Sequence, residues 1–392
     1  MKNPRKQGHS SAPKRFDPDP ARGFLPSKDP LDRLPARYDV WETAAYGLPK
    51  LLTTTHVRSH LSQLPALPLD GLKTEPQRER AMLLLSYFGH AWVWGEAVAS
   101  ARLPANLAVP WHAIATQLGR LPVLSYASYA LHNWRRMDAR GPVALGNIVL
   151  LQNFLGGVDE EWFILIHVDI EAKAGVALAA IDAAREAAGD AVALHANLTD
   201  MGGALAAMYG TLCRMPEFCD PYIYYNRVRP YIHGWKNNPA LPDGLVYEGV
   251  KAYGGKPQKL AGETGAQSSI IPALDAALGV GHDDDPLRPY LLDMRNYMPP
   301  AHREFIASVE ASAGIRSFVM AQKDNLVLRE AYNACVTWVE RFRAKHLEYA
   351  ASYIFKQAQS SVANPTAVGT GSTPFMPYLK KHRDETSRHR IR

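Results

Sequence analysis

One histidine near the C-terminal end of the chain lies within an otherwise apolar and aromatic stripe. The stripe repeats in steps of three or four residues and consists of Leu328, Tyr332, Cys335, Val339, Phe342, His346, Tyr349 and Tyr353. Such steps keep side chains on one face of a helix. A buried imidazole needs partners for its ring nitrogens. His346 is therefore either a hydrogen-bonded core histidine or the axial ligand of a buried metal or haem iron.

A second histidine has a similar setting. Phe163, His167, Ile170 and Ala174 follow one another at helical spacing within a predicted helix over 159–188. Two buried histidines on different helices fit a haem sandwiched in a helical bundle, although core histidines also occur in pairs by chance. The chain has no CxxCH motif, so any haem would be bound non-covalently.

Arginine and threonine side chains mark two further candidate sites. Arg227 and Arg229 lie in a segment (215–240) that is rich in Tyr and Pro. An arginine among aromatic rings suits bidentate capture of a carboxylate, and it equally suits cation–π packing at a surface. The Gly-Thr-Gly sequence at 369–371 is a flexible loop whose Thr370 could bind a small polar group, or a simple turn. Motifs of hydrolases and nucleotide-binding enzymes are absent.

Helical periodicity dominates the elements that must position these side chains. It begins near Trp41 and predicts helices at 78–101, 110–118, 124–137, 159–188, 190–214, 267–279, 286–296, 300–311 and 326–358. Asp159 is expected to cap the 159–188 helix. Residues 139–158 predict a connector with a short buried helix, and 241–265 predict a glycine-rich loop. Because alternating strand patterns are almost absent, we expect an all-α fold, with a large helical bundle and a smaller N-terminal helical domain.

Four regions are expected along the chain. They are an extended proline-rich arm at 1–37, a small helical domain and connector at 38–158, a large helical domain at 159–379 with a mobile loop at 369–371, and a basic tail at 380–392. The 392 residues carry a net charge of +6. The arm has nine Lys/Arg against four Asp/Glu and the tail six against two, so the remaining body is slightly acidic. Both ends look loosely ordered.

Composition also bears on partners and location. The body has no basic stripe with interleaved aromatic residues, so we expect no nucleic-acid partner. The chain shows no apolar run of spanning length and no signal-peptide pattern, so we expect no membrane association. Its three cysteines form no CxxC pattern, which indicates a reducing, cytoplasmic setting.

Several sequence blocks resemble the indoleamine 2,3-dioxygenase family. They are GWKNNPALPDGLVYEGV (234–250), AGETGAQSSI (261–270), MRNYMPPAHREF (294–305), LREAYNACV (328–336) and the late GTGST. The match extends back through LPVLSYASYALHNW (121–134) and the 159–188 helix. It covers roughly residues 30–380, with the basic tails outside it. Members of this family are haem enzymes that open the indole ring of tryptophan, so the resemblance implies a haem-binding helical bundle.

The resemblance implies roles for residues on the proximal side of the haem. His346 falls on the proximal ligand of the haem iron, and Arg343 falls on an arginine near a haem propionate. Asp275 matches an acidic residue of the proximal network, and Trp235 also lies on the proximal side.

Distal roles follow in the same way. The positions implied to line the substrate pocket are Tyr126, Phe163, Tyr224, Tyr225 and Arg229. Arg229 matches the arginine that pairs with the amino-acid carboxylate, and Thr370 matches a threonine in a mobile loop that contacts the substrate's amino-acid group. The segment over the haem contains Thr264, Gly265 and Ala266.

Three departures from the family pattern affect the pocket. His167 stands where the animal enzymes have serine, whereas the related tryptophan 2,3-dioxygenases carry a histidine that contacts the indole N–H. Tyr224 and Tyr225 replace a pair of phenylalanines, and Tyr129 stands in the wall where a smaller side chain is usual. These departures predict a tighter or more polar pocket, with His167 as the residue that assists catalysis.

The implied function is that of a haem b-dependent dioxygenase. It would insert both atoms of O2 across the indole C2=C3 bond of L-tryptophan, or of a close indole derivative, to give N-formylkynurenine. An electron donor would keep the haem ferrous, and the chain is expected to be a monomer. Two alternatives stay open: a haem enzyme of bacterial secondary metabolism that hydroxylates or rearranges a tryptophan derivative, and a haem protein that binds O2 without turnover.

Overall fold

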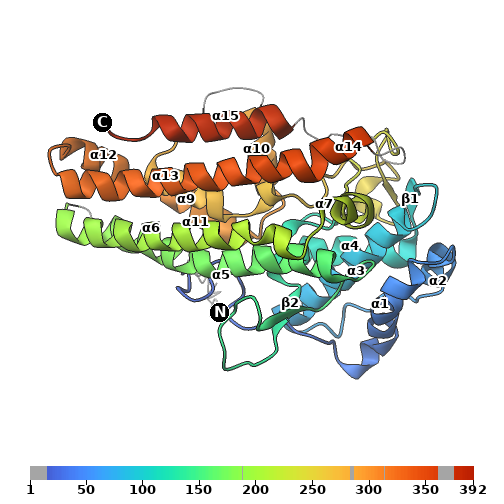
Figure 1. Cartoon of the computed structure of the whole chain (residues 1–392). Coiled ribbons are helices and arrows are strands. Elements are labelled where there is room, and N and C mark those ends of the chain that lie inside the picture. The colour runs from blue at the N-terminus through green and yellow to red at the C-terminus, as the bar shows by residue number, and fades with distance from the viewer. Residues whose placement is uncertain (1–15, 188, 283–286, 313, 361–374) are drawn as a thin grey trace, which may run out of the picture.

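Four long helices form the body of the molecule. A computed structural model describes residues 16–187, 189–282, 287–312, 314–360 and 375–392. The long helices are α5 (Val158–Glu186), α6 (Ala191–Cys213), α13 (Leu326–Tyr349) and α15 (Phe375–Arg388). They lie side by side in the order α5, α6, α13, α15, so that α13 is packed between α6 and α15 (Figure 1). The expectation of an all-α fold is confirmed.

Local capping explains where two of these helices begin. The Asp190 side chain accepts hydrogen bonds from the N–H groups of the first turn of α6. The Asn325 side chain does the same for α13, accepting from Leu328 N at 3.2 Å. The prediction that Asp159 caps α5 is wrong. The helix begins at Val158, and the Asp159 carboxylate instead accepts from the backbone N–H of Asp220 at 2.7 Å.

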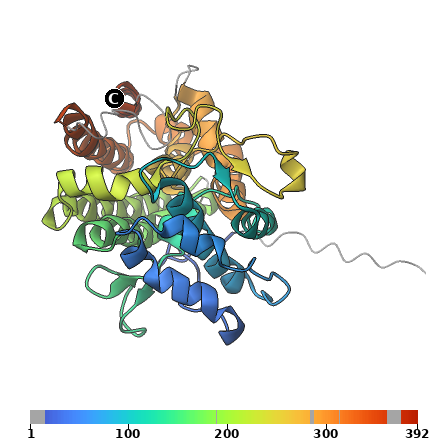
Figure 2. The same cartoon turned by 90° about the vertical axis from the view of Figure 1, so that its right-hand side faces the viewer.

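A smaller group of N-terminal helices packs below α5. It consists of η1 (Ala36–Tyr38), α1 (Asp39–Leu51), α2 (Val57–Ser62), α3 (Glu75–Trp94) and α4 (Ala105–Gln117). Helix α3 starts with a capping box between Thr74 and Gln77 and is buried on nearly all sides. Figure 2, which views the long helices nearly along their axes, shows these blue-to-teal helices on the side of α5 away from α13 and α15.

Short elements connect the two groups. The remaining helices are η3 (Met215–Glu217), α7 (Pro221–Ile223), α8 (Arg229–Ile232), η5 (Lys251–Tyr253), η6 (Gly265–Gln267), α9 (Ile270–Leu278), α10 (Leu287–Arg295), α11 (Pro300–Ala311), α12 (Ile315–Ala321) and α14 (Lys356–Ser360). Strand β1 (Arg102–Leu103) pairs in parallel with β4 (Val246–Tyr247). Strand β2 (Trp134–Arg136) pairs antiparallel with β3 (Ile148–Leu150), with Arg135 opposite Val149.

The hairpin of β2 and β3 corrects two predicted helices. The helix expected over 124–137 is one π-helical turn, η2 (Ala127–Leu131), followed by β2, and the short buried helix expected within 139–158 is absent. Gly146 has a φ of 92°, which a helix does not permit. The buried Asn133 side chain then holds the second strand in place by accepting from Gln152 N at 2.8 Å.

Three π-helical turns interrupt the described helical segments. They are η2, η4 (Tyr224–Val228) and η7 (Ala350–Phe355). Two of them, η4 and η7, are in contact with each other. Such turns change the direction of the side chains that follow, and they are frequent at functional sites.

Most of the basic C-terminal tail lies in helix α15. Glu385 and Thr386 of α15 are 2% and 0% exposed, and the helix packs along α13. The expectation of a loosely ordered tail is therefore wrong for this end of the chain. At the other end, residues 16–35 form turns that lie against α5. A Cβ on Gly175 would lie only 2.5 Å from the Pro20 carbonyl oxygen, which requires glycine at this contact.

Two hydrophobic cores hold the fold together. One surrounds α3 and α4 and also contains apolar residues of the segment 232–261. The other fills the space between α5, α6, α9 and α13. Within the part of the chain that the structure describes, we find no helix with the length and apolar character needed to cross a membrane.

Candidate functional site

Aromatic side chains of three segments meet beside the N-terminal part of α5. The Phe163 ring lies 4.7 Å from the His167 ring and 4.6 Å from the Tyr224 ring, measured between centroids. Tyr126 and Tyr129 approach from η2, with centroids 5.8 Å from His167 and 6.4 Å from Phe163, respectively. We call these five residues the distal cluster. The structure thus brings together the α5 pair and three of the predicted pocket tyrosines.

The hydrogen bond of His167 determines which of its nitrogens is available. Nδ1 lies 2.7 Å from the carbonyl oxygen of Phe163, one helical turn earlier. Because a carbonyl oxygen only accepts, Nδ1 carries the proton. Burial lowers the pKa of His167, so the ring is neutral at pH 7 and its Nε2 is a hydrogen-bond acceptor.

His346 lies on α13 within electrostatic range of His167. Its side chain is exposed, but desolvation by the surrounding protein, followed by the nearby His167 imidazole, lowers the pKa of its imidazole to about 4. Among the described residues, its ring nitrogens have no hydrogen-bond partner. The neutral imidazole is therefore suited to bind a metal ion.

The structure distinguishes the two arginines of the tyrosine-rich segment. Arg229 is fully buried, and its Cζ atom lies 5.1 Å from the centroid of the buried Tyr225 ring. Arg227 is exposed. Burial lowers the pKa of Arg229, and the nearby Tyr224 and Tyr225 counteract this effect. The cation–π contact is thus an interior one, next to the distal cluster.

A backbone crossing brings the segment 262–266 to the same region. A Cβ on Gly234 or on Gly262 would collide with the backbone of the other segment. The two segments can therefore approach this closely only because both positions are glycine. The crossing is extended by a hydrogen bond from Glu263 N to Ile232 O at 3.1 Å. Thr264 then caps η6, accepting weakly from Ala266 N at 3.4 Å, and Gly265 is exposed.

Two buried carboxyl groups beside the distal cluster were missed by the sequence analysis. Glu171 accepts from the Tyr126 hydroxyl at 2.8 Å and from the Ser268 hydroxyl at 2.9 Å, and burial raises its pKa to about 7. Burial raises the pKa of Glu263 to about 8. Glu171 could have been found from its spacing, because it lies one helical turn after His167 and therefore on the same face of α5. Glu263 lies in the segment 261–270 that resembles the family, but no periodic spacing marks it as a buried residue.

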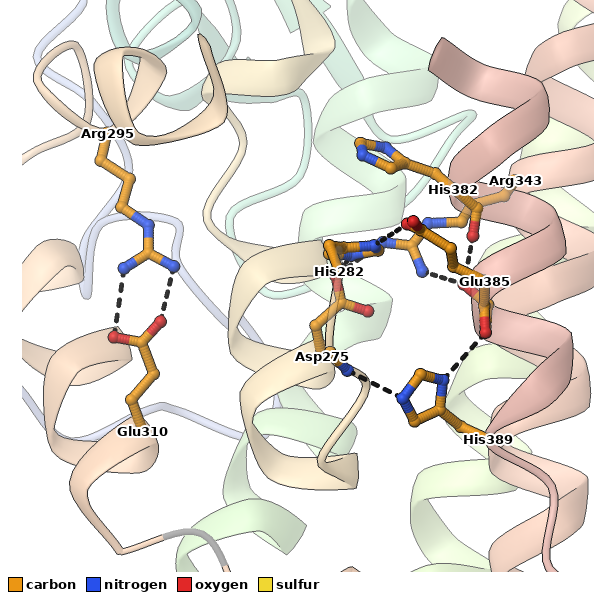
Figure 3. A network of polar contacts seen from close by, with 10 residues as sticks. Asp275, His282, Arg295, Glu310, Arg343, His382, Glu385 and His389 are labelled. Carbon is orange, nitrogen blue, oxygen red and sulfur yellow. Dashed lines mark hydrogen bonds and ion pairs between the residues drawn. The ribbon is translucent and has the colours of Figure 1, made fainter. Parts of the chain in front are cut away.

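Arg343 of α13 and Asp275 of α9 form an ion pair where these helices meet α15. Arg343 Nη2 lies 2.6 Å from Asp275 Oδ2, and Arg343 Nη1 donates to the Thr386 hydroxyl of α15. Asp275 Oδ2 also contacts His282 Nε2 at 3.2 Å (Figure 3). The pKa of Asp275 is about 2, because Arg343 and His282 outweigh the effect of burial. The structure therefore brings together Arg343 and Asp275 as predicted.

Two predicted residues lie apart from these groups. Trp235 is fully buried in a separate aromatic group, with centroids 5.1 Å from His90 and 6.4 Å from Trp111. Its expected position on the proximal side stays a prediction. Thr370 and the loop 369–371 lie outside the described residues.

Comparison with known proteins connects this arrangement to one family. Residues 12–389 match the family described as "Indoleamine 2,3-dioxygenase", so the similarity includes most of both basic ends, contrary to expectation. The chain is 36% identical to indoleamine 2,3-dioxygenase 1 of Rattus norvegicus, covering 92% of this chain and 91% of the rat protein. It is 32% identical to human indoleamine 2,3-dioxygenase 2, covering 93% and 92%.

A fungal relative has a different name. The chain is 34% identical to "6-hydroxytryptophan 2,3-dioxygenase fscD" of Fusarium equiseti, covering 93% of this chain and 94% of the fungal protein. A family match across nearly the whole chain, together with relatives above 30% identity over more than 90% of their lengths, is decisive. This chain belongs to the indoleamine 2,3-dioxygenase family.

Proposed function

We propose that this protein is a haem b-dependent dioxygenase that converts L-tryptophan, or a close indole derivative, to N-formylkynurenine. The observation that carries the proposal is the relation between the distal cluster and His346. An aromatic environment with one oriented acceptor, His167 Nε2, lies within electrostatic range of a neutral imidazole, His346 on α13. The family relation supports the same reaction.

The residues present fit a haem group. A histidine that ligates haem iron must be neutral, and His346 has that form with ring nitrogens that no described residue occupies. Arg343 would hold a propionate while keeping its contact with Asp275, since a guanidinium has five N–H donors. When bound, the haem supplies the iron that activates O2.

The protein's own side chains would bind and orient the indole. Arg229 would pair with the substrate carboxylate, because a buried guanidinium gains most from an anionic partner. The Phe163 ring would pack against the indole, and His167 Nε2 would accept the indole N–H. Tyr126, held by Glu171, would form a rigid wall. Such positioning would hold C2 and C3 of the indole in one orientation for the reaction with O2.

One experiment tests this function. The haem-loaded protein is reduced and mixed with L-tryptophan and O2, and N-formylkynurenine is followed by absorbance and by mass. We expect stoichiometric formation of the product. A stable oxygenated haem spectrum without product would instead indicate an O2-binding protein. A hydroxylated or rearranged product would favour the secondary-metabolism alternative.

A hydroxylated indole is a second candidate substrate. The Tyr129 side chain is 1% exposed, and its hydroxyl has no hydrogen-bond partner among the described residues. A buried hydroxyl without a partner is costly, so a polar group on the substrate would stabilise it. A relative is named as a 6-hydroxytryptophan dioxygenase. We infer that a ring hydroxyl on the indole would meet Tyr129.

The Tyr129→Phe variant tests this candidate because it removes only the hydroxyl. We expect the ratio of kcat/KM for 6-hydroxytryptophan to that for tryptophan to fall about fivefold, as the loss of one neutral hydrogen bond predicts. An unchanged ratio would leave tryptophan as the better assignment.

The remaining parts of the proposal concern partners and location. The three cysteines are free, and two of them are buried, which supports a reducing compartment such as the cytoplasm. We propose that the chain acts as a monomer and that a cellular electron donor keeps the haem ferrous. Analytical ultracentrifugation of the haem-loaded protein tests the first point.

A further inference from the structure

Three potential metal ligands meet where the C-terminal helix contacts the segment after α9. His382 and Glu385 are three residues apart on α15, so they project from the same face of that helix. His282 comes from the segment that follows α9. One nitrogen of each histidine and one oxygen of Glu385 all lie within 4.8 Å of one another (Figure 3). These residues lie outside the distal cluster and have no part in the proposed reaction.

His282 has the surroundings of a ligand histidine. Its Nδ1 lies 2.6 Å from Glu385 Oε2, and its Nε2 lies 3.2 Å from Asp275 Oδ2. Asp275 is itself held by Arg343. Metal-bound histidines usually donate their second ring N–H to a carboxylate, which fixes the orientation of the ring. Asp275 would serve this purpose while Nδ1 faces the metal.

His382 provides the independent indication of a ligand. The side chain is 8% exposed, and its Nε2 is buried with no hydrogen-bond partner among the described residues. Its ring lies 4.5 Å from the His282 ring, between centroids. A buried imidazole nitrogen without a partner is unfavourable. A metal ion between the two histidines would satisfy it.

We propose that His282, His382 and Glu385 bind one divalent transition-metal ion, for which Zn²⁺ is the best match. Two imidazoles and one carboxylate are a common zinc ligand set, with water in the fourth position. Mg²⁺ and Ca²⁺ prefer oxygen ligands and would bind poorly. Ligand atoms around tetrahedral zinc lie about 3.3 Å apart, so the contact between His282 and Glu385 must open slightly as the metal replaces their shared proton.

Charged side chains of both signs surround the cluster. Asp275 and Glu385 are the nearby carboxylates, whereas Arg343 and Lys381 are the nearby cations, with Lys381 Nζ 3.3 Å from Glu385 Oε1. The ion would join α15 to the segment after α9. Through Asp275 and Arg343 it would also stabilise α13, the helix that carries His346. The expected role is structural, fastening the C-terminal helix onto the haem domain.

The test measures zinc bound to the haem-loaded full chain. The protein is stripped with EDTA and then dialysed against low micromolar Zn²⁺. Bound zinc and haem iron are measured in the same samples by mass spectrometry. The variants His382→Phe, which keeps the ring but removes its nitrogens, and Glu385→Gln are compared with His60→Ala. His60 is an exposed histidine on α2 and serves as the control.

We expect one zinc ion per chain in the wild type and in His60→Ala, at least tenfold weaker binding in the other two variants, and unchanged haem content. Zinc, but not Mg²⁺, should raise the Tm of the wild type and leave that of His382→Phe unaffected. Equal zinc binding by wild type and His382→Phe would overturn the assignment. Wild-type protein that retains no zinc would also overturn it.

Discussion

The buried carboxyl of Glu171 makes a testable link between pH, stability and the distal cluster. Its side chain is fully buried, and burial raises its pKa to about 7 from an ordinary value of 4.5. Oε1 accepts both hydroxyl hydrogen bonds, while Oε2 has no partner among the described residues. The protonated form therefore suits this position better than the carboxylate. Glutamine has the shape of the protonated form and keeps the accepting oxygen.

The size of the effect follows from the two pKa values. Below about pH 4.5 the carboxyl is protonated in both the folded and the unfolded chain, and the folded state has no penalty. As the pH rises toward 7, the unfolded chain releases the proton while the folded chain retains it, so stability falls. Above pH 7 the penalty is complete. At about 1.4 kcal/mol for each tenfold change in acidity, it amounts to about 3 kcal/mol.

We therefore expect Glu171→Gln to be more stable than the wild type at pH 8 by about 2 to 3 kcal/mol, and by less than about 1 kcal/mol at pH 5. The assay is urea unfolding of the haem-loaded protein at both pH values, followed by circular dichroism. Glu186→Gln, an exposed change at the end of the same helix, is the control. Other buried carboxyls are present in both proteins and cancel. The same stability difference at pH 5 and pH 8 would refute the reasoning.

Three further variants examine the proposed site. Arg229→Ala should raise KM for L-tryptophan by roughly 30-fold or more, because a buried charge pair is worth about 2 kcal/mol or more. Arg227→Ala, a change at an exposed residue, should leave this KM unchanged. Equal KM values for the two variants would contradict the contact between Arg229 and the carboxylate. His167→Ala should reduce the preference for L-tryptophan over 1-methyltryptophan about fivefold, since only the former has an N–H for Nε2. A preserved preference would exclude this hydrogen bond. His346→Ala should lower the Soret absorbance about tenfold at equal protein concentration, with recovery on adding imidazole. Unchanged spectra would disprove the ligand assignment.

Helical periodicity was a reliable guide where the chemistry depends on one element. The steps of three and four residues along α13 correctly placed Tyr332 and Cys335 on a buried face, but His346, on the same stripe, is exposed in the structure. The pairing of Phe163 with His167 followed from the same rule. Both predictions rely only on spacing within a continuous helix, which is set by backbone geometry.

The choice between the two arginines could not come from spacing. Arg227 and Arg229 are two residues apart, so they project about 200° apart around an α-helix, and this spacing does not say which of them faces inward. In the structure Arg227 lies within the π-helical turn η4 and is exposed, whereas Arg229 directly follows that turn and is buried. A π turn depends on packing against neighbouring elements and has no simple sequence signal.

Composition gave a wrong expectation for the C-terminal tail. Its charge suggested loose order, yet Glu385 and Thr386 are buried on α15, where His282 and Arg343 contact them. Charged residues can be buried when partners from distant segments satisfy them. Composition contains no information on such partners, since they come from positions more than forty residues away.

By itself, then, the sequence determined the helical class, the family and the residues that lie on one face of a single helix, because these depend on local spacing and on long matching blocks. Only the tertiary structure decided which arginine is buried, which nitrogen of His167 accepts, and how Glu171, Glu263 and the His282–His382–Glu385 group are surrounded. Those properties arise from desolvation and hydrogen bonding between segments that are distant in the chain, and they exist only once the helices have packed.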